Sequence, residues 1–224
     1  MRKVWHVLAG LFLLGTTVFA AETETEIQKE GQKSDILVAY VSRAGENYNV
    51  GVADPDSASA AYAGYIEKGN TQIVAEYIAE MTGADLYAIT TQDPYPEDYQ
   101  SMLTQAQEEL DQDARPALAG EMPDMEEYQT IFIGYPIWHA AIPRPVLSFL
   151  DNGNFEGKRI IPFNTHEGSG QSSTVEEIIS EVGETGDVTI EDGLAIQGKT
   201  AQEDEKATRE KLEQWLGELG MVQE

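Results

Sequence analysis

The chain contains no cysteine, few basic residues and no apolar run longer than a short hydrophobic segment. The lack of cysteine excludes disulfides, thiolate metal sites, thiol catalysis and a lipid-modified cysteine. Its 14 basic residues stand against 40 acidic ones, a formal net charge of −26. Nucleic acid and anionic membrane surfaces are therefore poor partners. His139 and His166 are the histidines outside the N-terminal segment, and their wide spacing argues against a metal site, so we expect no metal.

The main apolar run lies close to the N-terminus, from Val7 to Ala20, and follows Arg2 and Lys3. A basic start, a short apolar stretch and small residues at its end are typical of a secretory signal peptide. The run is shorter than the roughly 20 residues that a spanning helix needs. We therefore expect cleavage after Ala20, with an uncleaved membrane anchor as the alternative.

Three parts of the chain follow from this interpretation. Residues 1–20 are a signal peptide, residues 21–34 are a polar tether without apolar periodicity, and residues 35–224 are a single domain. The protein is then expected to be exported, either extracellular or held in the cell envelope.

The domain alternates short β-branched apolar runs with amphipathic helical patterns. The pattern predicts strands at 35–41, 84–90, 130–135, 159–165 and 188–197, and helices at 70–82, 97–111, 143–151, 172–182 and 201–219. This alternation is typical of an α/β fold, a doubly wound five-stranded parallel sheet with helices on both faces. In such sheets, ligands bind outside the carboxyl ends of the strands.

A split phosphate-binding pattern surrounds the first helix. Ser42, Arg43 and Ala44 follow the first strand, and Gly69-Asn70-Thr71 opens the helix. Hydroxyl side chains, a glycine and the free N–H groups of a helix N-terminus together suit a dianionic phosphate. Arg43 either adds a charge-assisted contact to the phosphate or pairs with a carboxylate of this acidic chain.

An aromatic loop follows the third strand, in the segment Gly134-Tyr135-Pro136-Ile137-Trp138-His139. Pro136 ends the strand, and Trp138 offers a flat face at its carboxyl end. Trp138 is either a wall for a flat ligand or an ordinary core or surface aromatic. His139 is either a surface residue or a proton source.

A third polar loop, Thr165-His166-Glu167-Gly168-Ser169-Gly170, follows the fourth strand. With these three loops the chain resembles the flavodoxin family over about residues 35–220. The resemblance implies a flavodoxin-like sheet of strand order 2-1-3-4-5 that binds FMN non-covalently, with redox chemistry on the isoalloxazine ring.

The resemblance also assigns binding roles to residues and leaves the catalytic residues unknown. It places the phosphate near the split loop, the ring against the aromatic loop and the pyrimidine end of the ring under the third loop. The implied FMN-binding residues are Ser42, Arg43, Gly69, Asn70, Thr71, Pro136, Ile137, Trp138, His139, Thr165, His166, Glu167, Gly168, Ser169 and Gly170.

The expected function is electron transfer outside the cytoplasm, with an FMN-dependent oxidoreductase favoured over a simple carrier. The acceptor is a small quinone, reduced by two electrons, or a basic redox protein steered by the acidic surface. A flavin-free surface protein that binds a partner with the same loops is the alternative from another class. Residues 45–68 are an insertion inside the phosphate loop, and form either a lid or a tolerated surface excursion.

Overall fold

The computed structural model describes residues 34–46, 65–183 and 187–221. The predicted signal peptide, nearly all of the predicted tether and the middle of the 45–68 insertion lie outside these residues. Within the described ranges, no helix has the length and apolar character needed to cross a bilayer.

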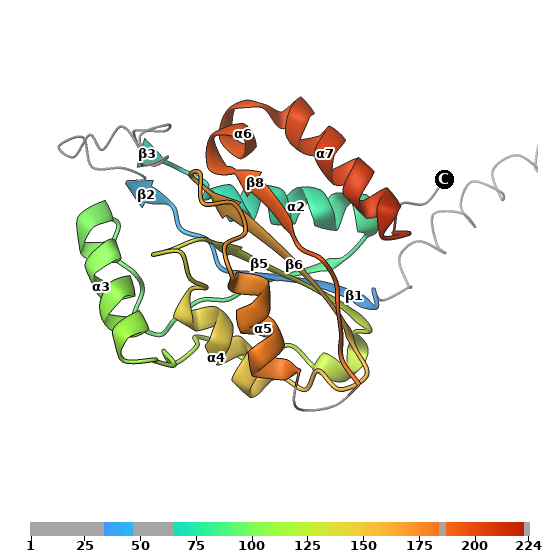
Figure 1. Ribbon diagram of the computed structural model, residues 1–224, viewed down its shortest axis with the longest axis horizontal. Helices are drawn as coiled ribbons and strands as arrows, with labels where there is room; N and C mark the ends of the chain where they lie inside the picture. Colours follow the sequence, from blue (N-terminus) through green and yellow to red (C-terminus); the bar gives the residue numbers. More distant parts are fainter. Residues whose placement is uncertain (1–33, 47–64, 184–186, 222–224) are drawn as a thin grey trace, which may run out of the picture. The chain divides into compact units, whose positions relative to one another are not determined.

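A parallel sheet forms the centre of the domain (Figure 1). Its strands are β1 (Ile36–Tyr40), β4 (Asp85–Ala88), β5 (Thr130–Pro136), β6 (Arg159–His166), β7 (Thr189–Ile190) and β8 (Leu194–Gln197). The order is β4-β1-β5-β6, and β7 and β8 both pair with β6 on its outer side. This is the predicted order 2-1-3-4-5, with the fifth strand in two pieces. The predicted α/β fold is confirmed.

The sequence predicted one continuous strand over 188–197, and this was wrong, because the structure has two short strands, β7 and β8. Between the two pairings, β6 advances from Ile160 to Phe163 while its neighbour advances from Ile190 to Leu194. The outer strand therefore carries one extra residue, as in a β-bulge. Pro162 of β6 lies at this break and has no N–H group to donate to a regular ladder.

Helices cover both faces of the sheet. They are α2 (Asn70–Thr82), α3 (Tyr99–Asp111), α4 (Arg144–Asn152), α5 (Thr174–Val182), α6 (Gly198–Glu203) and α7 (Glu205–Glu218), with a short 3₁₀ turn at Met125–Glu127. Figure 1 shows α2, α6 and α7 over one face, and α4 and α5 over the other. The predicted last helix is two helices, because Asp204 leaves the helical conformation and its side chain caps α7 at the N–H of Ala207 (3.0 Å).

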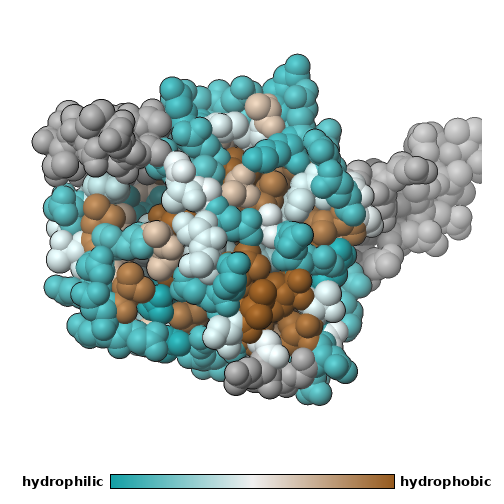
Figure 2. Space-filling model, in the orientation of Figure 1, coloured by the Kyte–Doolittle hydropathy of each residue, from teal (hydrophilic) through white to brown (hydrophobic). Residues whose placement is uncertain are grey.

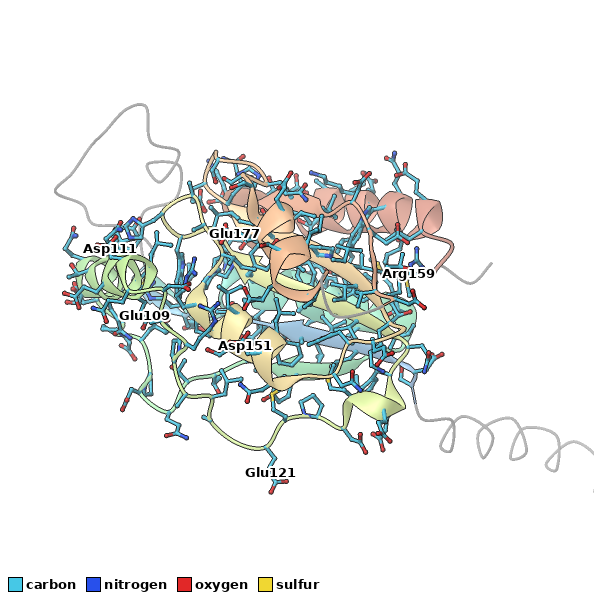
Figure 3. All side chains as sticks on the ribbon, turned by 60° about the horizontal axis from the view of Figure 1, so that its bottom comes forward. Glu109, Asp111, Glu121, Asp151, Arg159 and Glu177 are labelled. Carbon is cyan, nitrogen blue, oxygen red and sulfur yellow. The ribbon has the colours of Figure 1, made fainter. Side chains whose placement is uncertain are left out.

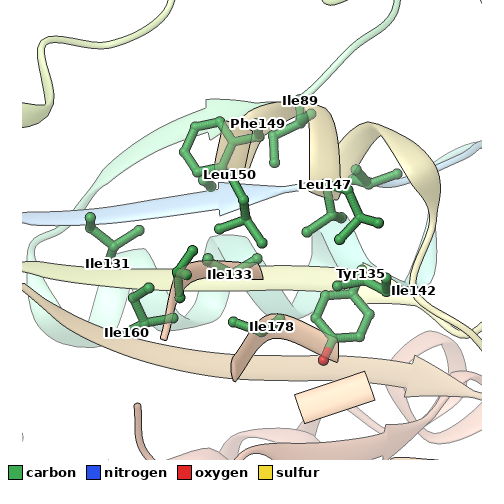
Figure 4. Close-up of a cluster of buried hydrophobic side chains, with 14 of the residues drawn as sticks. Ile89, Ile131, Ile133, Tyr135, Ile142, Leu147, Phe149, Leu150, Ile160 and Ile178 are labelled. Carbon is green, nitrogen blue, oxygen red and sulfur yellow. The ribbon is translucent and has the colours of Figure 1, made fainter. Parts of the chain in front are cut away.

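Two apolar cores result, one on each side of the sheet. Alternate residues of β5 point to opposite faces, so Ile131 and Ile133 join the core under α4 and α5, and Phe132 joins the core under α2 and α7. Figure 4 shows the first of these cores, with Tyr135 near the carboxyl end of β5. The Tyr135 hydroxyl donates to Thr174 Oγ1 of α5 (3.0 Å).

The surface reflects the excess of acidic residues. Hydrophilic side chains dominate the face in Figure 2, and Glu109 and Asp111 project from α3 in Figure 3. Arg115, in the loop after α3, forms three ion pairs: with Asp113 (2.8 Å), Asp151 of α4 and Glu181 of α5 (2.9 Å each). These pairs fasten the end of α3 to the helices behind it.

Candidate functional site

A cleft of about 310 Å³ lies at the carboxyl ends of β1, β5 and β6. Residues from all three predicted loops line it: Ser42, Arg43, Asn70, Thr71, Pro136, Ile137, Trp138, His139, Thr165, His166 and Glu167. Gly69, Gly168, Ser169 and Gly170 lie outside its lining. The loops that the sequence singled out thus meet in one place, as the sheet topology requires.

The N-terminus of α2 forms one end of the cleft, and Ser42, in the loop after β1, caps it. Gly69 is the N-cap residue and has no side chain to bind the first turn, but Ser42 Oγ accepts a hydrogen bond from the N–H of Gln72 (3.1 Å). A Cβ on Gly69 would lie 2.2 Å from Ser42 Oγ and 2.5 Å from the Arg43 carbonyl oxygen. Glycine is therefore required for the two chain segments to approach this closely.

Buried polar groups continue the wall behind α2. The hydroxyls of Thr71 and Thr165 form a buried hydrogen bond of 2.7 Å, which ties the helix to β6. Asn70 Nδ2 donates to Glu167 Oε1 at 3.5 Å. Asn70 Oδ1 and Glu167 Oε2 are both buried without a hydrogen-bond partner. Two acceptor atoms are thus left for a donor that this structure does not supply.

Arg43 lines the cleft and donates hydrogen bonds to the main chain before α3. Its Nε donates to the carbonyl oxygen of Pro96 (3.2 Å), and its Nη2 donates to that of Glu97. These bonds hold the segment before α3 at the rim of the cleft.

Trp138 is buried, with 9% of its surface exposed, and still forms part of the cleft wall. Its ring meets the ring of Tyr95 edge to face, with centroids 4.9 Å apart. Trp138 therefore packs in the core and also lines the cleft, so the structure leaves it in a position to contact a ligand.

A tight turn presents Trp138. The N–H and carbonyl groups of Trp138 and Ala141 bond each other (3.2 and 2.9 Å), and the two residues between them have positive φ: 51° for His139 and 60° for Ala140. Two consecutive positive φ angles define a type I′ turn, which favours Asn-Gly and is strained for His-Ala. The exposed His139 ring is bonded through Nε2 to the Leu103 carbonyl (2.9 Å), so Nε2 carries the proton.

Charged groups hold this turn from behind. The N–H of Ile142 donates to Glu177 Oε1 (3.4 Å), and Arg144 pairs with Glu177 (3.4 Å) and Asp113 (3.0 Å). Figure 3 shows Glu177 on α5. Burial raises the pKa of Glu177, and the N–H of Ile142 and Arg144 oppose that rise.

Sequence reasoning missed four residues of the cleft, Ile66, Tyr99, Met102 and Leu103. Tyr99, Met102 and Leu103 form one face of α3, which starts after the capping residue Asp98 (side chain to the N–H of Ser101, 2.7 Å). Ile66 arrives through an antiparallel pair between Gly45–Glu46 and Tyr65–Ile66, the two ends of the insertion. The i, i+3, i+4 spacing on α3 is visible in the sequence, but it does not say what the face packs against.

The third loop contributes two titratable side chains. His166 Nδ1 accepts a hydrogen bond from the N–H of Gly168 (2.9 Å), and burial with the charge of Lys211 lowers the pKa of His166. Burial raises the pKa of Glu167 to about 7. Near neutral pH the cleft therefore presents a neutral imidazole and a carboxyl group that is partly protonated. In the described part of the chain, no cluster of His, Asp and Glu is arranged to hold a metal.

Comparisons with known proteins agree with this geometry. A family model described as Flavodoxin matches residues 57–218. Putative flavoproteins from Bacteroides uniformis and Bacteroides eggerthii are 25% and 26% identical; the matches cover 83% and 84% of this chain and 99% of each of theirs, with TM-scores of 0.60 and 0.61. A flavoprotein of Lactobacillus acidophilus, solved in complex with FMN, shares the fold at 17% identity (TM-score 0.51, 74% of this chain, 93% of the other). No curated protein matches the chain.

Proposed function

The chain belongs to the flavodoxin family, and from this premise we propose that it binds FMN in the cleft and transfers electrons. The observation that carries the proposal is the meeting of a capped helix N-terminus and a tryptophan wall in one cleft. The first suits a phosphate and the second suits a flat ring, and FMN contains both.

The residues present fit this cofactor. Gly69 leaves the space in which Ser42 reaches the first turn of α2, where N–H groups have no partner within the helix. Ser42, Asn70 and Thr71 would hold the phosphate, with the helix dipole in place of a cation. Pro136, Ile137 and Trp138 would bound the ring. Bound FMN supplies the exchange of one or two electrons, and the protein supplies binding, orientation and exclusion of water.

A comparison of FMN with riboflavin tests the phosphate assignment, because riboflavin lacks the phosphate. Asn70→Ala should weaken FMN binding by about 1.5–3 kcal/mol, roughly 10- to 150-fold, and leave riboflavin binding nearly unchanged. Fluorescence titration of each flavin measures both affinities. Gln214→Ala, an amide lost from the exposed face of α7, is the matched control and should change neither. Equal losses for the two flavins would refute the assignment, and a protein that binds neither would favour the flavin-free alternative.

We propose a small, flat molecule such as a quinone as the electron acceptor. A second cavity of about 260 Å³ adjoins the first, and Ser42, Arg43 and Trp138 line both. Its remaining wall is largely apolar, with Ile89, Pro94, Tyr95 and Pro145 among its residues. This composition supports a small, flat and uncharged acceptor that takes up two electrons and two protons.

Anaerobic mixing of the reduced protein with benzoquinone tests the acceptor. Reoxidation should be fast and should saturate with quinone concentration, since saturation reports a binding site. Thr91→Trp, which fills the second cavity, should raise the half-saturating concentration several-fold, and Thr104→Trp on the exposed face of α3 should not. A linear dependence in every variant would favour a protein acceptor instead.

We also propose that the protein is exported. The support comes from the sequence alone. Arg2 and Lys3 precede the apolar run, and the run ends with the small residue Ala20. Mass spectrometry of the protein from its native source should find an N-terminus at Ala21 in the extracellular or envelope fraction. An intact Met1 in the membrane fraction would indicate an anchor.

A further inference from the structure

Glu167 has an unusual position for a carboxyl group, because it lines the cleft and forms no salt bridge with any cation in the described part of the chain. The residue follows β6 directly, and Oε1 receives a long hydrogen bond of 3.5 Å from Asn70 Nδ2. Glu167 Oε2 is buried and has no hydrogen-bond partner, and the same is true of Asn70 Oδ1. An ionised carboxylate would need more donors than this environment provides.

The packing around this pair is tight. A Cβ on Gly198, the first residue of α6, would lie 2.2 Å from both Asn70 Nδ2 and Glu167 Oε1. Any larger residue at position 198 would push the amide and the carboxyl group from their places. The glycine therefore keeps the pair in the wall of the cleft.

The charged groups of the neighbouring elements are directed elsewhere. Lys68, before α2, pairs with Glu76 (2.7 Å), and Lys199 of α6 pairs with Glu203 (3.8 Å). Lys211 of α7 donates to the carbonyl oxygen of Ala195 (2.8 Å). His166, on the same strand, is neutral at Nδ1, where it accepts a hydrogen bond. In the described ranges, none of these groups forms an ion pair with Glu167.

A phosphate at the N-terminus of α2 sharpens the conflict. Asn70 is a proposed phosphate ligand and is also the hydrogen-bond partner of Glu167, so the two anions would share one amide. The Coulomb repulsion between the Glu167 carboxylate and the phosphate would be much stronger in this partly buried site than between the same two charges in water. A neutral carboxylic acid removes the repulsion and turns Glu167 into a hydrogen-bond donor.

We propose that Glu167 is protonated in the complex with FMN and donates a hydrogen bond into the cleft, so that binding above neutral pH takes up one proton. This inference rests on the proposed function, since it concerns the same cofactor. In the free protein, burial raises the pKa of Glu167 to about 7. Below that pH the acid is already formed and binding takes up no proton, whereas above it each bound FMN requires one.

The dependence of FMN affinity on pH tests the proposal. For the wild-type protein, Kd should rise by about tenfold per pH unit above about pH 7 and approach a constant value as the pH falls to about 7. Glu167→Gln keeps a donor and cannot ionise, so its Kd should stay level between about pH 7 and pH 9, where the phosphate of FMN is already a dianion. Glu213→Gln removes the same charge from the exposed face of α7 and should keep the wild-type profile.

Fluorescence titration at each pH supplies the affinities. A level wild-type profile, or a Glu167→Gln profile as steep as that of the wild type, would overturn the inference and leave FMN binding intact. Absence of FMN binding at every pH would overturn the proposed function, and this inference with it.

A second measurement uses the wild-type protein alone and does not depend on a variant that folds. Carbon-13 NMR of labelled glutamate carboxyl groups follows the titration of Glu167 with and without FMN. Addition of FMN should move the midpoint of the Glu167 titration to higher pH. A shift to lower pH would show that the carboxylate is the bound form and would overturn the inference.

Discussion

Gly69→Ala should damage both the stability of the domain and its affinity for FMN. The added Cβ would lie 2.2 Å from Ser42 Oγ, 2.5 Å from the Arg43 carbonyl oxygen and 2.9 Å from the Arg43 carbonyl carbon. Contacts below 3.0 Å require a shift of the neighbouring atoms. Ser42 is able to rotate away, but the Arg43 carbonyl belongs to the main chain that follows β1.

The two responses have separate energies. Rotation of Ser42 breaks its hydrogen bond to the N–H of Gln72, a loss of about 1 kcal/mol. Displacement of the main chain at Arg43 resembles overpacking of a core, which costs about 1–3 kcal/mol. Together they lower the free energy of unfolding by about 2–4 kcal/mol, less than the total stability of an ordinary domain, so the variant still folds.

Urea denaturation measures the stability, and fluorescence titration measures the binding of FMN and riboflavin. FMN should lose more affinity than riboflavin, because the rotated Ser42 hydroxyl no longer faces the phosphate. Gly217→Ala is the matched control, since its Cβ would meet nothing within 4 Å on α7, and it should raise stability by about 0.5–1 kcal/mol. If both variants gain stability, the close approach at Gly69 is not a constraint and the argument fails.

Trp138→Leu should lower the free energy of unfolding by about 2–4 kcal/mol, because the ring is 9% exposed; it should also weaken FMN and riboflavin equally in titrations, and a loss confined to FMN would contradict a ring contact. Ala140→Gly should raise stability in urea by about 1 kcal/mol, because it relieves a φ of 60°; an unchanged midpoint would speak against strain in the turn. Glu167 keeps its proton in the folded state up to about pH 7, whereas in the unfolded chain it ionises at about pH 4.5. The free energy of unfolding of the wild type should therefore fall relative to that of Glu167→Gln as the pH rises from about 4.5 to about 7, and then level off. The expected change is about 1–2 kcal/mol after allowance for partial exposure. Urea midpoints that move together across this range would contradict the raised pKa.

Local patterns in the sequence predicted the elements and the loops that surround the site. β-Branched runs with helical spacing between them are signals within a few residues of each other, and they gave the order of strands and helices. The motif around Trp138 and the one at Gly69-Asn70-Thr71 were visible for the same reason. The fifth strand and the last helix were the exceptions: the strand carries an extra residue where β6 has Pro162, and the helix is interrupted at Asp204.

The tertiary structure decided what the side chains of these motifs contact. Arg43 is bonded to the carbonyl oxygens before α3, and the face of α3 with Met102 closes the cleft. Neither contact could be predicted from the sequence. The Arg43 bonds join residues more than 50 positions apart, and the contact of Met102 with the cleft depends on where α3 is placed.

The sequence by itself determined the α/β architecture, the acidic surface and the three loops at the strand ends, because these depend on composition and on short-range periodicity. The state of Glu167 was decided only by the fold. A glutamate in a polar loop is expected to be a solvated anion. Its raised pKa arises from burial, to which Asn70 and Gly198 contribute from elements remote in the chain. Burial and charge pairing are properties of the assembled structure, and for that reason the chemistry of the cleft follows from packing rather than from any motif.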